Sequence, residues 1–419
     1  MLAELLYFLI PYQIFKSVFF RSGLTYLTTY FLINFFIPKV IRLFRREGVT
    51  SDFTKEQAVT GPYSGATPIM GGIVLIPSVV VSTLLWAWIN KYTVALLIII
   101  SAFSLIGAID DIAKVFNKRK VEVGKAAKKR HTDKADGVSG IVRLIFEFLV
   151  TGAMVAGIFL LSDGLDGHVL IPGVPLKTWF PHIPPMIFIP FIILVIVAGA
   201  NAVNLADGLD SLAAVPIVTC SVFVAAAAYI AGDAGWSERL KIVFISNDIK
   251  EVVIFAIAII AACIAFLKFN SPPASIYMGD IGSLGFGASV CTMFVFVKAE
   301  FYLPIVGWTF VLAALSTVIQ RVWFKIALMI RGREWAEKNR FFYRAPYHHH
   351  HQHMITYREE DHGIRSIWHH FLIKIGLGKI PNEDKFTSPH QVNNKVIWSN
   401  HLKAVSLLVI ALIVYFKLR

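Results

Sequence analysis

The stretch TVALLIIISAFSLIGAIDD, residues 93–111, decides the fold of this chain. It runs without a charge from Thr93 to Ile109 and then ends in two acids, Asp110 and Asp111. About 20 apolar residues are enough for a helix to cross the roughly 30 Å hydrocarbon core of a bilayer. The stretch therefore predicts a membrane-spanning helix with two carboxyl groups at its polar end.

The composition of the whole chain extends this prediction. Of its 419 residues, 56% are hydrophobic and only 16% are charged, whereas about a quarter of the residues in soluble domains are charged. We predict an all-α polytopic membrane protein with about ten transmembrane helices, at the following positions: Ser22–Phe44, Gly71–Ile89, Thr93–Ile109, Ile141–Leu161, Pro185–Ala200, Ser211–Ala231, Glu251–Leu267, Ile281–Val297, Leu303–Ile330 and Leu402–Phe416.

The basic residues predict which loops face the cytoplasm, because cytoplasmic loops are enriched in Lys and Arg. One set of loops holds 24 of these residues, and the opposite set (90–92, 162–184, 232–250 and 298–302) holds 6. We therefore expect both termini to be periplasmic. We also expect an interfacial segment at 1–21 and one integral-membrane domain at 22–419, with cytoplasmic loops at 45–69, 110–140, 201–210, 268–280 and 331–400.

The remaining global features exclude other classes of protein. The net charge of +13 lies mainly in the predicted cytoplasmic loops, which argues against a nucleic-acid partner. Cys220, Cys263 and Cys291 lie inside apolar runs without zinc or redox spacing, so we interpret them as packing residues.

Met1–Phe20 lacks an early basic region and a small-residue cleavage site, which favours an interfacial helix over a signal peptide.

Four polar clusters follow apolar runs, and all four fall in predicted cytoplasmic loops. The first is the acid pair Asp110 and Asp111. Ionised carboxylates near hydrocarbon are costly, so such residues are functional candidates. Two adjacent acids repel each other, which favours a bound cation or one raised pKa. The alternative is a pair of acids that simply face water at the membrane surface.

The second cluster is Asn201–Ser211. Asp207, Asp210 and Ser211 have the spacing i, i+3, i+4, and they share one face if a helix begins there. As an alternative, Asp210 or Ser211 caps the next helix, which leaves Asn204 and Asp207 unexplained.

The third cluster is Phe269–Ser283. Gly279 and Gly282 flank Asp280, and glycine permits close approach of a ligand to the backbone. Asp280 is either an ordinary helix N-cap or a ligand of Mg²⁺, which usually binds one or two carboxylates together with phosphate oxygens. Tyr277 either stacks on a nucleobase or has a structural role.

The fourth cluster is the run His348–His351, in a predicted basic loop. Zinc is one possible ligand, and phosphate or sugar oxygens are another, since adjacent histidines rarely all reach one ion. A weaker signal is the glycine-rich stretch Gly61–Gly72. Its backbone N–H groups at a helix start suit phosphate, although glycines also permit tight helix packing. We predict that the polar clusters meet at one face of the membrane.

Together these clusters resemble the polyprenyl-phosphate N-acetylhexosamine-1-phosphate transferase superfamily and, within it, the phospho-N-acetylmuramoyl-pentapeptide transferase (translocase I) family. The runs Asn-Leu-x-Asp-Gly-Leu-Asp and Met-Gly-Asp-x-Gly-Ser are specific to the superfamily, and Ala-Pro-x-His-His-His points to the muramoyl branch. The matching stretches follow the family's order: Thr67–Gly72, Asp110–Lys114, Asn201–Ala213, Phe269–Ser283 and Ala345–His350.

The resemblance implies a ten-helix, Mg²⁺-dependent enzyme of the bacterial cytoplasmic (inner) membrane, usually a homodimer. Such an enzyme transfers phospho-MurNAc-pentapeptide from UDP-MurNAc-pentapeptide to undecaprenyl phosphate, giving lipid I and UMP for peptidoglycan synthesis. The implied catalytic residues are Asp110, Asp111 and Asp280, with Mg²⁺ on Asp280 and Asp111. The implied substrate-binding residues are Lys114, Asn204, Asp207, Asp210, Asn270, Tyr277, His348, His349 and His350.

Some positions differ from the family pattern: Ser64 replaces a lysine, Ile69 a threonine and Ile112 an aromatic residue, and 118–135 is a Lys-rich insertion. We leave Ser64 and Ile69 out of the site. Three other functions stay open: a UDP-GlcNAc:undecaprenyl-phosphate GlcNAc-1-phosphate transferase, an ion-coupled transporter and a catalytically inactive scaffold. A transporter would need essential acids in mid-span, and the fourth to tenth predicted spans carry almost none between their ends.

Overall fold

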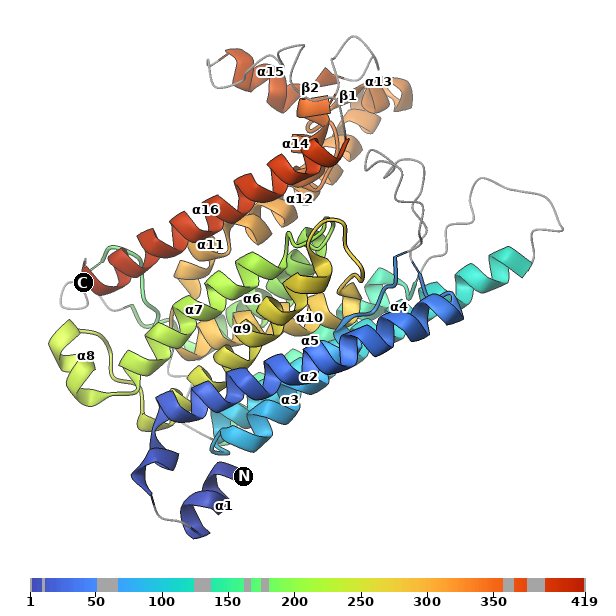
Figure 1. The fold of residues 1–419 in the computed structure, drawn as a ribbon. Coiled ribbons are helices and arrows are strands. Elements are labelled where there is room, and N and C mark those ends of the chain that lie inside the picture. The colour runs from blue at the N-terminus through green and yellow to red at the C-terminus, as the bar shows by residue number, and fades with distance from the viewer. Residues whose placement is uncertain are drawn as a thin grey trace.

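Helices form almost all of the regular structure, as predicted from the sequence. The computed structural model describes residues 2–9, 12–50, 67–123, 137–161, 167–174, 181–356, 365–374 and 389–417 (Figure 1). Within these residues the sheet consists of two short parallel strands, β1 (Asn339–Arg340) and β2 (Arg365–Ser366). The longer helices are α2 (Val18–Glu47), α4 (Lys91–Val123), α5 (Gly140–Leu161), α6 (Pro185–Ala206), α7 (Ala214–Ala231), α9 (Glu251–Asn270), α10 (Gly279–Phe296), α12 (Trp308–Arg331) and α16 (Pro389–Lys417).

The shorter helices connect these or cover their ends. They are α1 (Leu2–Leu9), η1 (Gln13–Lys16), α3 (Gly72–Trp86), α8 (Ala234–Leu240), η4 (Asn247–Lys250), η5 (Glu300–Tyr302), α11 (Leu303–Val306), α13 (Arg333–Lys338), α14 (Tyr347–Thr356) and α15 (Ile367–Lys374). In the described part of the chain, nine helices are long and apolar enough to cross a membrane. The tenth predicted span corresponds to α3, which is apolar but has only 15 residues.

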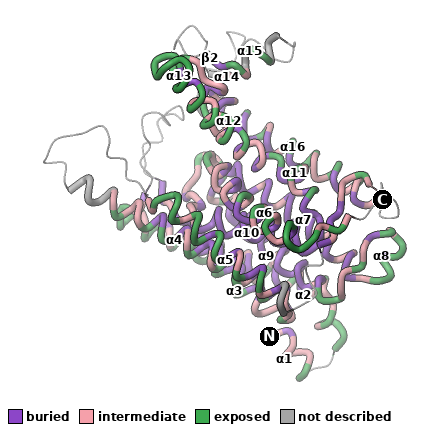
Figure 2. The backbone as a smooth tube through the Cα atoms, turned by 180° about the vertical axis from the view of Figure 1, so that it is seen from behind, coloured by how far each residue is buried: buried purple, intermediate pink, exposed green. Residues whose placement is uncertain are grey.

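Helices α9 and α10 form the centre of the bundle, where Figure 2 shows continuous burial. Every residue of α10 from Ile281 to Phe296 is buried. Helix α10 packs against α3, α4, α6 and α7, and α9 packs against α2, α3 and α7. A helix that is apolar on all sides is expected in such a central position.

Small residues bring neighbouring helices close to α10. A Cβ atom on Gly72 would lie 2.3 Å from the backbone nitrogen of Gly282, and one on Gly107 would lie 2.3 Å from the carbonyl oxygen of Asp280. Only glycine fits at such distances, as is common at helix contacts within membranes. Gly107 therefore lets Asp280, in the first turn of α10, lie against the helix that carries the acid pair, and Gly72 brings α3 to the same turn.

The bundle has two distinct ends. Helix α2 begins and α16 ends at one of them, and α14 lies at the other (Figures 1 and 2). We call these the outer end and the inner end. When α3 is counted, the chain crosses the bundle an even number of times, and both chain termini therefore lie at the outer end. That the inner end faces the cytoplasm stays a prediction from the distribution of Lys and Arg.

Several predicted boundaries are wrong, because helices continue into segments predicted as loops. Helix α4 runs through the acid pair to Val123, so the predicted loop 110–140 begins as helix. No Gly or Pro interrupts it there, and Lys114 can pair with an acid one turn earlier. Helix α6 ends at Ala206 inside the predicted loop 201–210, and α16 begins at Pro389 rather than Leu402. Ser64, residues 124–135 of the insertion and residues 375–388 lie outside the described residues.

Candidate active site

Helix α4 carries the acid pair into the interior, where Asp110 and Asp111 are each 3% exposed. Lys114 follows one turn later, and its Nζ lies 2.7 Å from Asp110 Oδ2 and 3.8 Å from Asp111 Oδ1. Asp110 Oδ1 also accepts a hydrogen bond of 2.8 Å from the N–H of Val138, and Asp111 Oδ2 accepts one of 3.2 Å from the N–H of Ile281. Both carboxylates are thus fixed, and Asp111 has the weaker contact with a cation.

Asp280 joins this pair from α10. The N-cap of α10 is Met278, so the alternative that Asp280 merely caps the helix is wrong. Asp280 Oδ2 lies 2.9 Å from Lys114 Nζ and 3.2 Å from Arg143 Nη1. Lys114 therefore bridges Asp110 and Asp280, which are far apart in the sequence.

A second layer of polar side chains supports these acids, and two of its members, Arg143 and Glu147, were not predicted from the sequence. Arg143 Nε lies 3.4 Å from Glu147 Oε1, and Arg143 Nη2 donates a 3.1 Å hydrogen bond to Asn201 Oδ1. Asn201 Nδ2 donates a 2.5 Å hydrogen bond to Glu147 Oε2. The available signal was an Arg and a Glu four residues apart inside a predicted span, since ionisable residues within membranes usually mark a site.

Acidic groups outnumber basic groups in this cluster, which consists of Asp110, Asp111, Lys114, Arg143, Glu147, Asp207 and Asp280. The negative charges of Asp280 and Asp111 act on Asp207 as well. Oxygen donors in excess of cations suit a hard divalent ion such as Mg²⁺, so the residues fit the implied metal. No preformed group of three or more His, Cys, Asp or Glu ligands occurs among the described residues. Instead, the ammonium group of Lys114 lies where Asp110 and Asp280 converge.

The loop between α6 and α7 does not form the predicted helical face. Residues 207–213 form turns, since α6 ends before Asp207 and α7 begins at Ala214. Asp210 Oδ2 instead accepts a 3.0 Å hydrogen bond from the N–H of Ala274. This contact connects the second polar cluster to the third. Beside it, Asn204 Nδ2 donates a 3.0 Å hydrogen bond to Ser283 Oγ at the start of α10.

Asn270 joins the same two loops from inside the protein. It is 3% exposed, and its Oδ1 accepts a 2.8 Å hydrogen bond from the N–H of Ser211. Its Nδ2 donates a 2.9 Å hydrogen bond to the carbonyl oxygen of Ile276. In this structure the amide therefore positions the loops, and it is engaged by the protein itself rather than open to a ligand.

The environment of these loops changes the pKa values of two predicted contact residues. Burial, followed by the negative charges of Asp280 and Asp111, raises the pKa of Asp207 to about 7. Burial, followed by the neighbouring Asp210 carboxylate, raises the pKa of Tyr277 well above its usual value. Tyr277 thus keeps its proton at neutral pH and can donate a hydrogen bond.

The histidine run is helical, not a loop as predicted, because it lies in α14, which contains no Gly or Pro. Successive side chains of a helix point in different directions. His348 points toward the α6–α7 loop, since a Cβ on Gly208 would lie 2.7 Å from its Nε2. That Nε2 is buried and has no hydrogen-bond partner within the described residues. Burial lowers the pKa of His348 well below its usual value, so the ring is neutral at pH 7.

The next two histidines are held by neighbouring residues. His349 Nδ1 lies 2.7 Å from Gln352 Oε1, and burial lowers the pKa of His349. His350 is fully buried, and its Nδ1 accepts a 3.1 Å hydrogen bond from the N–H of Tyr343. His348 lies nearest the α6–α7 loop with a buried ring nitrogen that has no partner among the described residues, and His349 Nε2 lies farther from the same loop, 3.7 Å from a Cβ placed on Gly208.

The first glycine-rich loop also reaches the site, but it does not offer its N–H groups to a ligand. Gly71 and Gly72 donate 2.8 Å hydrogen bonds to the carbonyl oxygens of Tyr277 and Met278. Tyr277 in turn donates from its N–H to the carbonyl oxygen of Pro68. These bonds confirm that the polar clusters converge, and they show that the phosphate-binding role suggested for these two glycines is wrong in this structure.

The chain is similar to known proteins over most of its length. The model of glycosyl transferase family 4 matches residues 93–298. A phospho-N-acetylmuramoyl-pentapeptide-transferase from Desulfotalea psychrophila is 33% identical over 345 residues, which cover 81% of this chain and 87% of that protein. Proteins of the same name from Thermodesulfovibrio yellowstonii (33% over 356 residues, 84% and 91% covered) and Bartonella quintana (35% over 340 residues, 81% and 86% covered) are similarly close.

Proposed function

This chain belongs to the phospho-N-acetylmuramoyl-pentapeptide-transferase family, within glycosyl transferase family 4, and we propose that it catalyses the reaction for which that family is named. The substrates are UDP-MurNAc-pentapeptide and undecaprenyl phosphate, and the products are lipid I and UMP. The protein is a multi-pass protein of the bacterial inner membrane, where lipid I serves peptidoglycan synthesis. We further propose that it depends on Mg²⁺ and functions as a homodimer.

One observation carries the proposal: the buried Asp110 of α4 and the partly buried Asp280 of α10 converge on Lys114 at the inner end of the bundle. Both substrates bear phosphate groups, which these carboxylates would repel on their own. A divalent cation removes this conflict, because Mg²⁺ is typically bound by one or two carboxylates and by phosphate oxygens. The excess of acids therefore supports a site for phosphate chemistry with a metal.

We assign Mg²⁺ to Asp280 and Asp111. Asp111 suits this role because its Oδ1 lies 3.8 Å from Lys114 Nζ and is only weakly neutralised. When bound, Mg²⁺ supplies positive charge that polarises the diphosphate and stabilises the leaving nucleotide. Lys114 and Arg143 hold the Asp280 carboxylate in place, and Lys114, which is 38% exposed, can also contact a phosphate oxygen.

In the proposed reaction, an oxygen of undecaprenyl phosphate attacks the β-phosphorus of the UDP-sugar. A new P–O bond forms there, the bond between this phosphorus and the bridging oxygen breaks, and UMP leaves with the bonding electrons. A phosphate monoester is largely ionised at pH 7, so the nucleophile needs positioning more than deprotonation. We assign this positioning to one of Asp110 and Asp111.

A covalent aspartyl-phosphate intermediate on one of these acids is the alternative route. Exchange of labelled UMP into UDP-MurNAc-pentapeptide without undecaprenyl phosphate would support the covalent route. Its clean absence would leave direct transfer.

The remaining predicted residues divide by position. Asp207, Asp210 and Tyr277 share the loops beside the acids, and we assign them and Asn204 to the nucleotide side of the substrate. We assign His348 to the sugar-peptide side, because its unused Nε2 faces the same loops. For His349, His350 and Asn270, the bonds described above favour a positioning role. These assignments combine the roles that the family resemblance implies with the contacts that these residues make in this chain.

The decisive experiment is UMP release by the purified protein from UDP-MurNAc-pentapeptide and undecaprenyl phosphate, with Mg²⁺ and with excess chelator. We expect release with Mg²⁺ and almost none with chelator. Replacing the donor by UDP-GlcNAc tests the alternative GlcNAc-1-phosphate transferase, and preferential use of UDP-GlcNAc would overturn the proposed substrate. No release from either donor by correctly folded protein would favour a transporter or an inactive scaffold.

A further inference from the structure

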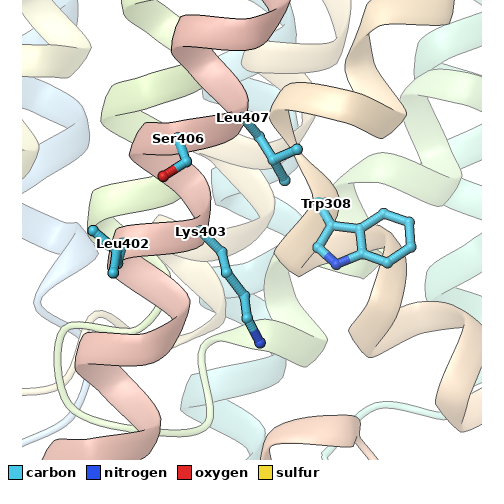
Figure 3. A pocket seen from close by; sticks show the side chains of 5 residues that line it. All are labelled: Trp308, Leu402, Lys403, Ser406 and Leu407. Atoms are coloured by element: carbon cyan, nitrogen blue, oxygen red, sulfur yellow. The ribbon is translucent and has the colours of Figure 1, made fainter. Parts of the chain in front are cut away.

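A pocket unrelated to the acid cluster lies between α12 and α16. It has a volume of about 460 Å³ and is lined by Trp308 of α12 together with Leu402, Lys403, Ser406 and Leu407 of α16 (Figure 3). Its lining is mainly apolar, and Lys403 is its one charged residue. A cation in an otherwise apolar pocket suits an amphipathic ligand that carries negative charge.

The charged side chains of α12 and α16 are all basic. Neither α12 nor α16 contains an Asp or a Glu, whereas both contain Lys or Arg. Among the described residues, Lys403 has no ion pair. Lys395 and Lys403 both act on His351, because their positive charges add to burial in lowering its pKa to about 4. The pocket thus has a cation for which the described residues supply no counter-ion.

The position of Lys403 along α16 can be compared with the inner end of the bundle. It lies within the apolar span of α16, two residues after His401. His401 Nε2 is 3.0 Å from the carbonyl oxygen of Ser211, in the α6–α7 loop at the inner end. Lys403 is therefore close to the inner ends of the helices. A flexible lysine at this level extends its charge toward the interface and leaves its carbon chain among apolar groups.

None of the residues that line the pocket belongs to the acid cluster. The acids and their partners are carried by α4, α5, α6 and α10, and α16 packs against α7, α11, α12 and α14. The pocket helices do adjoin the site, because α12 packs against α6 and α14 carries the histidine run. A ligand here has no need to react. We propose that this pocket binds the phosphate headgroup of an anionic glycerophospholipid, with Lys403 as its counter-ion and Trp308 and Leu402 against its acyl chains.

The experiment uses the tryptophan in the pocket as its reporter. The full-length protein is reconstituted in phosphatidylcholine vesicles that contain brominated phosphatidylglycerol or, in a parallel sample, brominated phosphatidylcholine. Bromine quenches tryptophan fluorescence on contact. We expect stronger quenching by phosphatidylglycerol, and the difference should disappear in Trp308→Phe, which identifies Trp308 as the tryptophan concerned.

Charge variants test the role of Lys403. In Lys403→Gln the preference for phosphatidylglycerol should fall about fivefold, the effect of one basic residue near a lipid surface. Lys403→Arg should retain the preference. Lys325→Gln is the matched control, because Lys325 is exposed on α12 and does not line the pocket. Equal quenching by both lipids, or a preference that survives in Lys403→Gln, would overturn the proposal.

Two further outcomes identify other occupants. If unbrominated undecaprenyl phosphate, added at one or two molecules per protein, abolishes quenching by phosphatidylglycerol, the pocket binds the prenyl phosphate and the assignment to a phospholipid is wrong. If neither brominated lipid quenches Trp308, lipid does not reach the pocket and the proposal is wrong; a second copy of the chain over the pocket would give this result. Both outcomes leave the proposed transferase activity untouched, since they concern a site distinct from the acids.

Discussion

Buried charges occur at both ends of the bundle, and the two groups are built differently. At the outer end, Arg21 of α2 faces Glu251 of α9, with Nη1 and Nη2 at 2.6 and 2.7 Å from the two carboxylate oxygens. The carbonyl oxygen of Trp86 and the N–H of Trp88 complete the pair. The two side chains are 3% and 9% exposed, and one positive charge meets one negative charge.

The inner cluster differs from the outer pair in both charge balance and exposure. Its carboxylates outnumber Lys114 and Arg143, and the side chain of Lys114 is 38% exposed. The outer pair ties α2, α9 and the α3–α4 connection together and leaves nothing for a ligand. Burial of charge therefore does not by itself mark a functional site. An unbalanced and partly accessible group of charges is a stronger candidate, because its excess charge must be met by a further ion, a substrate or a bound proton.

The sharpest way to test this contrast is to neutralise an inner acid. We expect Asp280→Ala, Asp280→Asn and Asp111→Asn each to lower UMP release on the order of 10³-fold or more, because each removes charge that the transition state needs. Thermal stability should not fall, since these acids repel one another. Asp233→Asn, at the exposed N-cap of α8, is the control and should remain active. Near-normal turnover in purified Asp280→Ala would contradict the assignment of Mg²⁺ to Asp280.

At the outer end we expect a substitution to lower stability and to leave activity unchanged. Glu251→Gln leaves the Arg21 guanidinium buried without its counter-ion, which costs about 3–5 kcal/mol of stability. The activity of the molecules that remain folded should be unchanged. The measurement is thermal unfolding in detergent together with UMP release per folded molecule. Adding Arg21→Met should restore most of the stability, and a double variant as unstable as Glu251→Gln would contradict the one-to-one pairing.

Asp207 links stability and pH at the inner end. Its pKa is raised from 3.8 to about 7, so the folded protein binds one proton more than the unfolded chain between these pH values. This contribution to stability is present below about pH 4 and is lost as the pH rises through 7. Asp207→Asn should therefore raise the unfolding temperature by a few degrees at pH 8 but not at pH 4. An equal shift at both pH values would contradict the raised pKa.

The smallest expected effect concerns the histidines. His348→Ala should raise KM for UDP-MurNAc-pentapeptide up to about tenfold with little change in kcat, because it removes one hydrogen bond to the substrate. His351→Gln should change neither constant by more than about twofold and should leave the pH profile unchanged. His351, with a pKa of about 4, is already neutral at working pH. Equal losses in the two variants would argue against a specific role for His348.

The sequence predicted the fold class and the polar clusters that the structure brings together, while the roles of the individual site residues stay predictions, and the reasons for the failures are physical. Apolar runs and polar loop ends are local features, so the acid pair, Asp280 and the α6–α7 loop could be found. The role of Asn270 could not, because its partners Ser211 and Ile276 become neighbours only after folding. Arg143 and Glu147 went unnoticed because an arginine near the start of a span usually extends to the membrane surface.

Helix α3 is shorter than the hydrocarbon core of a bilayer. Its 15 residues measure only about 22 Å along the helix axis, against a hydrocarbon thickness of roughly 30 Å. This hydrophobic mismatch costs a fraction of a kcal/mol per ångström and thins the lipid beside the helix. Because α3 begins beside Tyr277, the thinned zone adjoins the nucleotide loops. We therefore expect acyl-chain length in the surrounding membrane to affect the depth at which a lipid-borne phosphate meets the acids.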